Sequence, residues 1–380
     1  MSDAKAALVL EDGCIFEGQS FGAAGGAFGE TVFYTGVVGY QEVLTHPSYR
    51  QTLVVMTYPI IGCYGTNGED NESPGVQAAG LIVREYSPYF SNFRATASLE
   101  AFMVRHGVVG IREVDTRAVA VHLRDCGEMR GAIVSGDFDA AAVARSLKLK
   151  GTPSPFGQDL AAKATWEGVR KADGRQRHKV VALNLGITSS LLAQLSRLGC
   201  TVDVVSCGAG AKDILARKPQ GVIVAGGPGD PRAAAGAVET VRSLVGKTPL
   251  LGIGLGHQVL ALALGCGIRR LKVGHHGVNY PVRDLVDGTS HITVQHHSFV
   301  VDESAIPKGI EVTHQNQNDG TVEGLRRRPV RAGVLARKGA AGLATASPWR
   351  AGSVQFHPCP DEMGRPSPLL AQWCKSLDQE

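Results

Sequence analysis

The chain has 380 residues, a hydrophobic fraction of 43% and a net charge of +4, which suits two or three domains with a sizeable core. The basic run "RRRP" at 326–329 is too short to indicate nucleic-acid binding, and we interpret it as a solvated loop. No stretch is typical of a membrane span, and "MSDAKAALVL" lacks the long apolar core of a secretory signal. Eight cysteines without a C-x-x-C pair indicate reduced thiols and a cytoplasmic location.

Residues 1–150 predict one strand-rich α+β domain. "ALVLEDGCIFEG" alternates around Asp12-Gly13, which is typical of a β-hairpin, and "TLVVMTY" and "AGLIVREY" are further strand candidates. "TASLEAFMVRHG" predicts a helix that begins at Thr or Ser and ends at Gly. "DTRAVAVHLRDCG" predicts another, with Asp115 as its N-cap and Gly127 as its C-cap. Residues 151–178 are polar and contain Gly, Pro and basic residues, so we expect a connection between domains there.

Residues 179–380 predict an α/β domain with a doubly wound, largely parallel sheet. Strand-like "VVALNL", "TVDVVSC", "GVIVAGG" and "PLLGIG" alternate with helix-like segments such as "SSLLAQLSRLG" and "HQVLALALG". Continuous apolar strands with intervening helices indicate a parallel sheet that is covered on both faces. Ligands bind at the carboxyl ends of such strands, where the chain has two glycine-rich turns, "AGGPGDP" (225–231) and "GIGLGHQ" (252–258).

The spacing of the second turn disfavours the usual phosphate loops. It has neither G-x-G-x-x-G nor the Gly-Lys-Ser/Thr of a Walker loop. A nucleophile elbow needs small residues on both sides of its tip, and Gly252 and Gly256 satisfy that need around Gly254. In an elbow, the N–H of Leu255 and a second N–H from "GGPGD" would face an oxyanion. From spacing alone, an elbow and a packing turn without chemistry remain equal alternatives.

Adjacent histidines occur at 275–276 and again at 296–297. Neighbouring residues of a strand point to opposite faces, so neither pair has the spacing of a metal site. We expect these histidines to make structural polar contacts, and we expect no metal site or cofactor in this chain.

Nine stretches in order carry a family resemblance: "LVLEDG", "TGVVGYQEVLTHPSYR", "MTYPIIGCYGTN", "SNFR", "VDTRAVAVHLRD", "GGPGDP", "GLGHQVLALALG", "KVGHHGVNYPV" and "DGTVEGL". The C-terminal half resembles a class I, triad-type glutamine amidotransferase domain. Over nearly its full length the chain resembles the small subunit of carbamoyl-phosphate synthetase. The resemblance implies an N-terminal domain that contacts a large subunit, ATP and Mg on that large subunit, an internal ammonia tunnel, and a role in arginine and pyrimidine biosynthesis.

The chain departs from the family pattern at the reactive positions. The family elbow reads G-I-C-L-G-H-Q with a cysteine nucleophile, and here that position is Gly254. The family's G-H-P-E reads Phe356-His357-Pro358-Cys359, so the histidine is retained and the third triad position is Cys359. The family's Asn in "NGPGDP" is Gly226, and "Q-N-H-G-F" reads Gln295-His296-His297-Ser298-Phe299. The stretch between "GTVEGL" and "FHP" is also longer and is rich in Arg, Ala and Gly.

Six other positions match those where the family contacts glutamine: Ser48, Gly227, Gly229, Leu255, Gln258 and Phe299. Amide hydrolysis by this route needs a nucleophile, a base and a group that orients the base, and glycine cannot attack. Cys359 belongs where the orienting carboxylate would stand, and Asp361 or Glu362 as substitute orienters would restore no nucleophile. His357 is then vestigial or a structural hydrogen-bond donor.

Three functions stay open. The first is a non-hydrolysing structural or regulatory subunit, paired with a large subunit that uses free ammonia. The second is a glutaminase subunit that works by an unrecognised route. The third is a free-standing protein that binds glutamine or another small amino acid in the old pocket.

Overall fold

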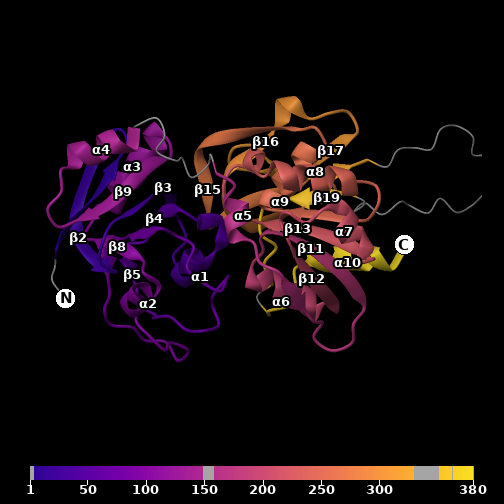
Figure 1. The fold of residues 1–380 in the computed structure, drawn as a ribbon, viewed down its shortest axis with the longest axis horizontal. Coiled ribbons are helices and arrows are strands. Elements are labelled where there is room, and N and C mark those ends of the chain that lie inside the picture. The colour runs from indigo at the N-terminus through magenta and orange to yellow at the C-terminus, as the bar shows by residue number, and fades with distance from the viewer. Residues whose placement is uncertain (1–3, 149–157, 329–350, 362, 380) are drawn as a thin grey trace, which may run out of the picture.

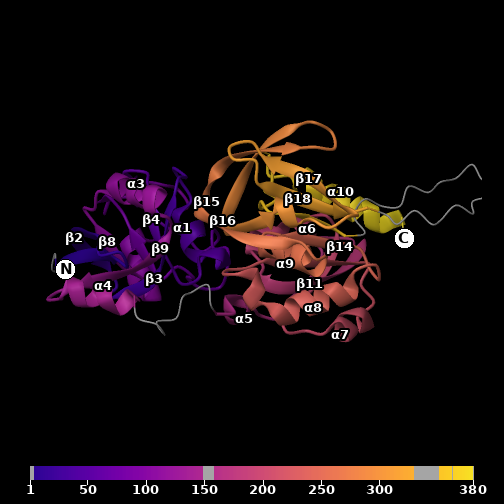
Figure 2. The same ribbon diagram turned by 90° about the horizontal axis from the view of Figure 1, so that it is seen from above.

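The computed structural model describes residues 4–148, 158–328, 351–361 and 363–379. Figures 1 and 2 show two lobes side by side, with the N-terminal domain at one end and the C-terminal α/β domain at the other. A long two-stranded ribbon of the second domain, β15 (Gly267–Asp284) and β16 (Ser290–Asp302), reaches over to the first domain. Within the described residues no helix is long and apolar enough to cross a membrane.

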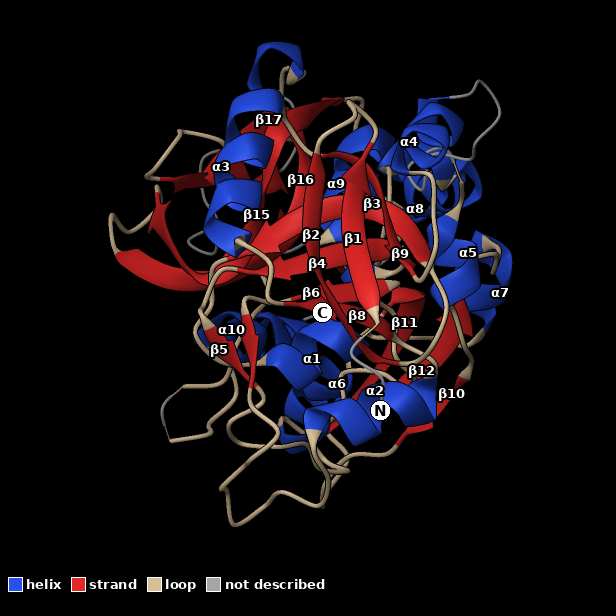
Figure 3. Cartoon of the chain, turned by 90° about the vertical axis from the view of Figure 1, so that its left-hand side faces the viewer, coloured by secondary structure: helices blue, strands red, loops and turns tan. Residues whose placement is uncertain are grey.

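Seven strands of the first domain form a closed barrel in the order β1-β2-β8-β6-β4-β3-β9 (Figure 3). Their bounds are β1 Lys5–Leu10, β2 Ile15–Gly22, β3 Ala27–Tyr34, β4 Thr52–Met56, β6 Gly80–Ile82, β8 Val109–Arg112 and β9 Met129–Ser135. β4 is buried along its whole length, because Leu53 and Val55 pack in one apolar cluster while Val54 and Met56 pack in another. The short strands β5 Ile60–Ile61 and β7 Glu85–Tyr86 pair beside the barrel.

The local predictions for this domain are confirmed. β1 and β2 form the expected hairpin, with Val9 opposite Ile15 across the Asp12-Gly13 turn. Helix α2 Leu99–His106 begins after Ser98, whose side chain accepts the N–H of Ala101. Helix α3 Thr116–Cys126 begins after Asp115 and ends before Gly127, as expected. The other described α-helices of this domain are α1 Tyr40–Thr45 and α4 Ala140–Lys148.

The second domain contains a ten-stranded sheet in the order β10-β12-β11-β13-β14-β19-β18-β16-β15-β17. The strands from β12 to β19 are parallel, and the others extend the sheet in antiparallel fashion. Their bounds are β10 Gly168–Arg170, β11 His178–Gly186, β12 Cys200–Ser206, β13 Gly221–Gly226, β14 Leu250–Ile253, β15 Gly267–Asp284, β16 Ser290–Asp302, β17 Ile310–Asn316, β18 Val322–Arg327 and β19 Gly352–Val354. The doubly wound α/β prediction is therefore confirmed, and the antiparallel half adds to it.

Helices cover both faces of the parallel part. α7, α8 and α9 contribute to one apolar cluster, and α6 and α10 contribute to the cluster on the opposite face. The bounds are α6 Ser189–Arg197, α7 Ala211–Ala216, α8 Ala235–Leu244, α9 Leu255–Ala263 and α10 Pro368–Ser376. Each alternating segment of the sequence thus forms the strand or helix that its periodicity indicates.

The segment expected to be a connection also contributes to the second domain. α5 Leu160–Ala164 packs on its sheet, and β10 pairs with β12 as an antiparallel edge strand. The polar composition of 151–178 gave no sign of β10, because an edge strand of three residues needs little burial of apolar side chains.

The two domains are joined by hydrogen bonds close to the carboxyl ends of the parallel strands. The N–H of Thr35 in the first domain donates to the carbonyl of His276, and the N–H of Ser189 donates to the carbonyl of Glu72. Gly274 N–H donates to the carboxylate of the buried Glu128. The hydroxyl of Ser48 also donates to the carbonyl of Gly227, so the first domain contacts a glycine-rich turn of the second.

Candidate active site

The turn between β14 and α9 has the geometry of a nucleophile elbow. Gly254 stands alone between the strand and the helix with φ 60° and ψ −121°, a conformation that side-chain-bearing residues rarely adopt. A Cβ at Gly252 would lie 2.6 Å from the carbonyl oxygen of Gly256, and a Cβ at Gly256 would lie 1.8 Å from that of Val224. Both flanking positions must therefore be glycine for the strand and helix to approach this closely.

The tip of the elbow has room for a side chain, in contrast to its flanks. A Cβ at Gly254 would lie 3.6 Å from Cε1 and 3.7 Å from Nε2 of His357, both ordinary van der Waals distances. The next residue, Leu255, begins α9, so its N–H has no intrahelical partner. The structure thus places His357 beside the tip of the turn and an N–H donor next to it, while the tip residue itself has no side chain.

His357 lies just beyond β19, where its N–H donates to the carbonyl of Val294. Its ring packs edge-on against His46 at 4.7 Å between centroids and lies 5.2 Å from the ring of His296. Within the described residues its imidazole has no hydrogen-bond partner. Burial lowers the pKa of His357 to about 4, so the imidazole is neutral at pH 7 and a weaker proton acceptor than an ordinary histidine.

No described residue orients His357. The thiol of Cys359 donates to the backbone carbonyl of His357 at 3.5 Å rather than to its ring. Desolvation around the sulfur raises the pKa of Cys359 to about 11, so it remains a neutral thiol. The carboxylate of Asp361 pairs with Arg365 at 2.6 Å, which removes it as a substitute orienter, and Glu362 lies outside the described residues.

The six residues expected to contact glutamine come together around one cavity of about 30 Å³, lined by Ser48, Gly227, Gly229, Leu255, Gln258 and Phe299 with six neighbours. Ser48 comes from the first domain, and its hydroxyl donates to the carbonyl of Gly227 at 3.3 Å. Gln258 donates to the carbonyls of Phe299 and the Gln355 side chain, and its own Oε1 has no partner among the described residues. That oxygen can accept a hydrogen bond from a ligand.

The cavity is small in this conformation. A volume of about 30 Å³ holds roughly two water molecules, whereas pockets for small organic ligands are on the order of 300–1,000 Å³. A glutamine substrate would require the walls to open.

The first glycine turn also has no room for a side chain at Gly226. A Cβ at Gly226 would lie 1.8 Å from the carbonyl oxygen of Gly186, and φ at Gly226 is +71°. Asparagine, the family residue there, does not fit this backbone. At this position the ends of β13 and β11 are close enough that only glycine fits.

A cluster of three histidines, His46, His296 and His357, fills the space beside the elbow and was not predicted. His46 and His296 lie 4.6 Å apart between ring centroids, and the hydroxyl of Tyr49 contacts Nδ1 of His296 at 2.8 Å. Burial, together with the neighbouring histidines, lowers the pKa of His46 and of His296 well below 6.5. The cluster is therefore uncharged at neutral pH. Only the departure of His296 from the family pattern could have signalled it.

The histidines on β15 and β16 make the polar contacts expected of them. His275 bonds Gln295 through Nδ1 at 2.8 Å and Asp319 through Nε2 at 2.9 Å. Although burial opposes it, the carboxylates of Asp319 and Glu323 raise the pKa of His275 to about 9. His276 lies 3.2 Å from the carboxylate of Glu128, so it links the two domains.

Most of the chain is similar to known proteins. The profile described as "Carbamoyl-phosphate synthase small chain, CPSase domain" matches residues 8–133, and "Glutamine amidotransferase class-I" matches residues 180–334. The carbamoyl phosphate synthase small chain of Syntrophotalea carbinolica is 44% identical over 335 residues, 84% of this chain and 89% of that protein. The chain belongs to the carbamoyl-phosphate synthase small-chain family.

Other carbamoyl-phosphate synthase small chains are similarly close. That of Chlorobaculum tepidum is 42% identical over 332 residues, which cover 86% of this chain and 90% of that protein. Among solved structures, a glutamine amidotransferase of Thermotoga maritima aligns with a TM-score of 0.35 and 16% identity, covering 54% of this chain and 84% of that one. This member of the small-chain family therefore combines the family's sequence over most of its length with an elbow that lacks a side chain.

Proposed function

We propose that the chain is the small subunit of a carbamoyl-phosphate synthase that does not hydrolyse glutamine and uses free ammonia. The observation that carries this proposal is Gly254 at the tip of the elbow, next to His357. Attack on an amide needs a nucleophile, and a triad enzyme without it retains only a small residue of its rate. The subunit then acts as a structural or regulatory component, in arginine and pyrimidine biosynthesis in the cytoplasm.

A water molecule activated by His357 is a poor substitute for the missing thiolate. A base with a pKa of about 4 removes a proton from water with little driving force at pH 7. Its ring has no carboxylate partner among the described residues to stabilise the imidazolium that would form. The neutral histidines beside it supply no compensating charge.

The partner in this proposal is the large subunit, which would carry ATP and Mg. The first domain offers a surface suited to such a contact: Tyr89 is 85% exposed and Phe93 is 97% exposed on the loop before α2, with Phe90 between them. Exposed aromatic groups of this kind mark protein–protein interaction sites. They lie outside the altered pocket, so loss of hydrolysis leaves the docking surface intact.

The test is carbamoyl phosphate synthesis by this chain co-purified with its cognate large subunit, with glutamine or ammonium chloride as nitrogen source. We expect synthesis with ammonium and none above background with glutamine. A double variant, Gly254→Cys with Cys359→Glu, restores the family residues at the nucleophile and third triad positions and tests whether these two changes are enough for glutamine use.

Glutamine-dependent synthesis by the unaltered complex would overturn the proposal. If that activity survived His357→Ala and was lost in Cys359→Ser, a route through the Cys359 thiol would replace it. Calorimetric titration of glutamine and other small amino acids into the isolated chain checks the remaining function. Tight binding without a stable large-subunit complex would favour a free-standing amino-acid-binding protein, for which the unpartnered Oε1 of Gln258 would be the recognition group.

A further inference from the structure

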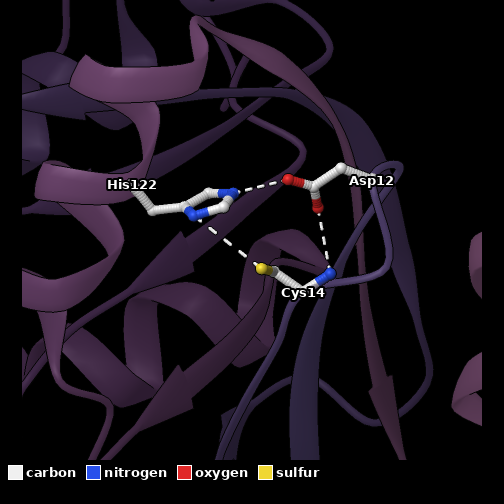
Figure 4. Close-up of side chains that lie close together, drawn as sticks. All are labelled: Asp12, Cys14 and His122. Atoms are coloured by element: carbon white, nitrogen blue, oxygen red, sulfur yellow. Dashed lines mark hydrogen bonds and ion pairs between the residues drawn. The ribbon is translucent and has the colours of Figure 1, made fainter.

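A second group of chemically reactive side chains lies in the first domain, away from the elbow. The β1–β2 turn supplies Asp12 and Cys14, and helix α3 supplies His122 (Figure 4). Nε2 of His122 lies 2.6 Å from Oδ2 of Asp12, and Nδ1 of the same ring lies 3.7 Å from the sulfur of Cys14. A thiol, an imidazole and a carboxylate therefore stand in the order that activates a nucleophilic cysteine.

The contact with Asp12 fixes which nitrogen of the neutral imidazole carries the hydrogen. An ionised carboxylate can only accept a hydrogen bond, so Nε2 of His122 donates to Asp12 and Nδ1 becomes the acceptor. Burial, and then the charges of Asp12 and Cys126, raise the pKa of the Cys14 thiol, so the sulfur keeps its proton at pH 7. The Cys14 S–H therefore donates to Nδ1, which is the nitrogen that can take up the proton.

The group is accessible to small molecules. Asp12 is exposed, and Cys14 and His122 are each partly exposed. A Cβ at Gly13, between Asp12 and Cys14, would have no atom within 4 Å apart from its chain neighbours. The turn that carries the thiol is thus open to solvent.

The backbone around Cys14 does not suit acyl transfer. That reaction needs N–H donors for the oxyanion that forms in the transition state. The N–H of Cys14 already donates to Oδ1 of Asp12 at 2.9 Å, and the N–H of Gly13 donates to the carbonyl of Leu10 at 3.0 Å. Thiol–disulfide exchange needs no such donors, because its negative charge develops on a leaving sulfur.

We propose that Cys14 is a modification site that exchanges with low-molecular-weight disulfides, with His122 as its base and Asp12 as the group that orients the base. Nδ1 of His122 takes the thiol proton as the Cys14 sulfur attacks one sulfur of the disulfide. A new S–S bond forms as the old one breaks, and the imidazolium returns the proton to the leaving thiolate. The products are a mixed disulfide at Cys14 and one free thiol, so the disulfide itself is the oxidant.

The raised pKa of the Cys14 thiol is compatible with this reaction. It leaves few thiolates at pH 7, but a thiolate of higher pKa is intrinsically more nucleophilic. A positioned base forms the thiolate only as the attack proceeds, so the resting fraction of thiolate no longer limits the rate. Exposure alone should therefore predict reactivity poorly in this domain, where Cys63 is exposed and Cys14 is only partly so.

The experiment treats the full, reduced chain with glutathione disulfide and follows the adduct at each cysteine by peptide mass spectrometry. We expect the adduct at Cys14 to form about tenfold or more faster than that at Cys63, and dithiothreitol to reverse it. His122→Gln should slow the Cys14 adduct about tenfold or more, since a general base contributes roughly 10²–10⁴-fold, and should leave Cys63 unchanged. His106→Gln, on α2 of the same domain, is the matched control and should react like the unaltered chain.

Asp12→Asn tests the orienting group without removing its backbone contact. The asparagine Oδ1 can still accept the N–H of Cys14, while its NH₂ group faces Nε2 of His122. Nε2 must then accept, so Nδ1 carries the hydrogen and is lost as a base. This variant should slow the Cys14 adduct about as much as His122→Gln.

The pH dependence separates a base from a merely structural histidine. In His122→Gln the rate at Cys14 should rise about tenfold per pH unit between pH 6 and 8, because only a thiolate formed in advance can react. In the unaltered chain the rise should be shallower, because the imidazole removes the proton during the attack. Both variants alter partly or fully exposed side chains and are expected to fold, which circular dichroism checks.

Two results would overturn the proposal. One is an adduct that forms at Cys14 no faster than at Cys63. The other is a Cys14 rate that is unchanged in both His122→Gln and Asp12→Asn. Neither result depends on glutamine use at the elbow, so this test and that of the proposed function are independent.

Discussion

Replacing Gly254 by alanine separates the conformation of the elbow from its chemistry. Alanine adds one carbon and no reactive group, so every change in stability comes from the backbone and from local packing. Gly254 has φ 60° and ψ −121°, which glycine adopts without steric cost and alanine does not.

The expected cost follows from two observations. The added Cβ would meet its nearest neighbour, Cε1 of His357, at 3.6 Å, and the carbonyl oxygen of Gln355 at 4.0 Å, so it creates no clash. What remains is the backbone strain of a side chain at positive φ, which costs about 1–3 kcal/mol. The free energy of unfolding should therefore fall by about that amount.

The assay is urea unfolding of the full chain, followed by circular dichroism and by fluorescence so that the two domains are monitored together. Gly256→Ala is the matched comparison, because its Cβ would lie 1.8 Å from the carbonyl oxygen of Val224. That variant should lose more than about 4 kcal/mol or fail to fold.

Two results would refute the reasoning. If Gly254→Ala were as stable as the unaltered chain or more stable, the turn would not hold the positive φ of an elbow. If Gly254→Ala and Gly256→Ala were equally damaging, the distinction between a tip with room and flanks without room would be wrong.

The remaining predictions concern pH and docking. Histidines whose pKa is lowered in the folded chain take up protons only on unfolding. The free energy of unfolding should therefore fall as pH drops from 6.5 toward 4, by up to about 3 kcal/mol for His357 alone. Urea midpoints should fall less steeply with pH in His296→Asn, and a fall in His291→Asn equal to that of the unaltered chain would exclude a general histidine effect. His275 acts in the opposite direction, because its raised pKa stabilises the folded chain below pH 6.5. This contribution should be lost as pH rises through about 9. If His275→Asn and the unaltered chain lost stability identically at alkaline pH, this prediction would be wrong. Phe93→Ser should weaken binding to the large subunit at least tenfold in calorimetry without changing the thermal midpoint, whereas Met363→Ser, 77% exposed on the second domain, should bind normally.

Local signals in the sequence predicted many elements correctly. The Asp12-Gly13 hairpin, the caps at Asp115 and Gly127, and the strand–helix alternation after residue 179 each depend on a few consecutive residues, so periodicity and capping chemistry are enough. Barrel closure was not predicted, because it depends on which strands pair, and β1 pairs with β9 about 120 residues later. The long β15–β16 ribbon was missed for the same reason, since its pairing crosses register shifts that no local pattern reveals.

The candidate site shows the same division. The six pocket residues were named from matches to a family pattern, and the structure brings them to one cavity from both domains. The histidine cluster was not predicted, because its members lie far apart in the chain. The stretch between "GTVEGL" and "FHP" falls largely on residues 329–350, outside the described residues.

By itself, the sequence determines that position 254 has no nucleophile, because glycine has no side chain whatever fold surrounds it. The flanking Gly252 and Gly256 likewise indicate a tight turn. Only the tertiary structure decides that His357 lies beside that empty position, that burial among two other histidines keeps it neutral, and that Cys359 bonds a backbone carbonyl instead of its ring. Reactivity depends on distance, orientation and desolvation, and these arise only when segments far apart in the chain pack together.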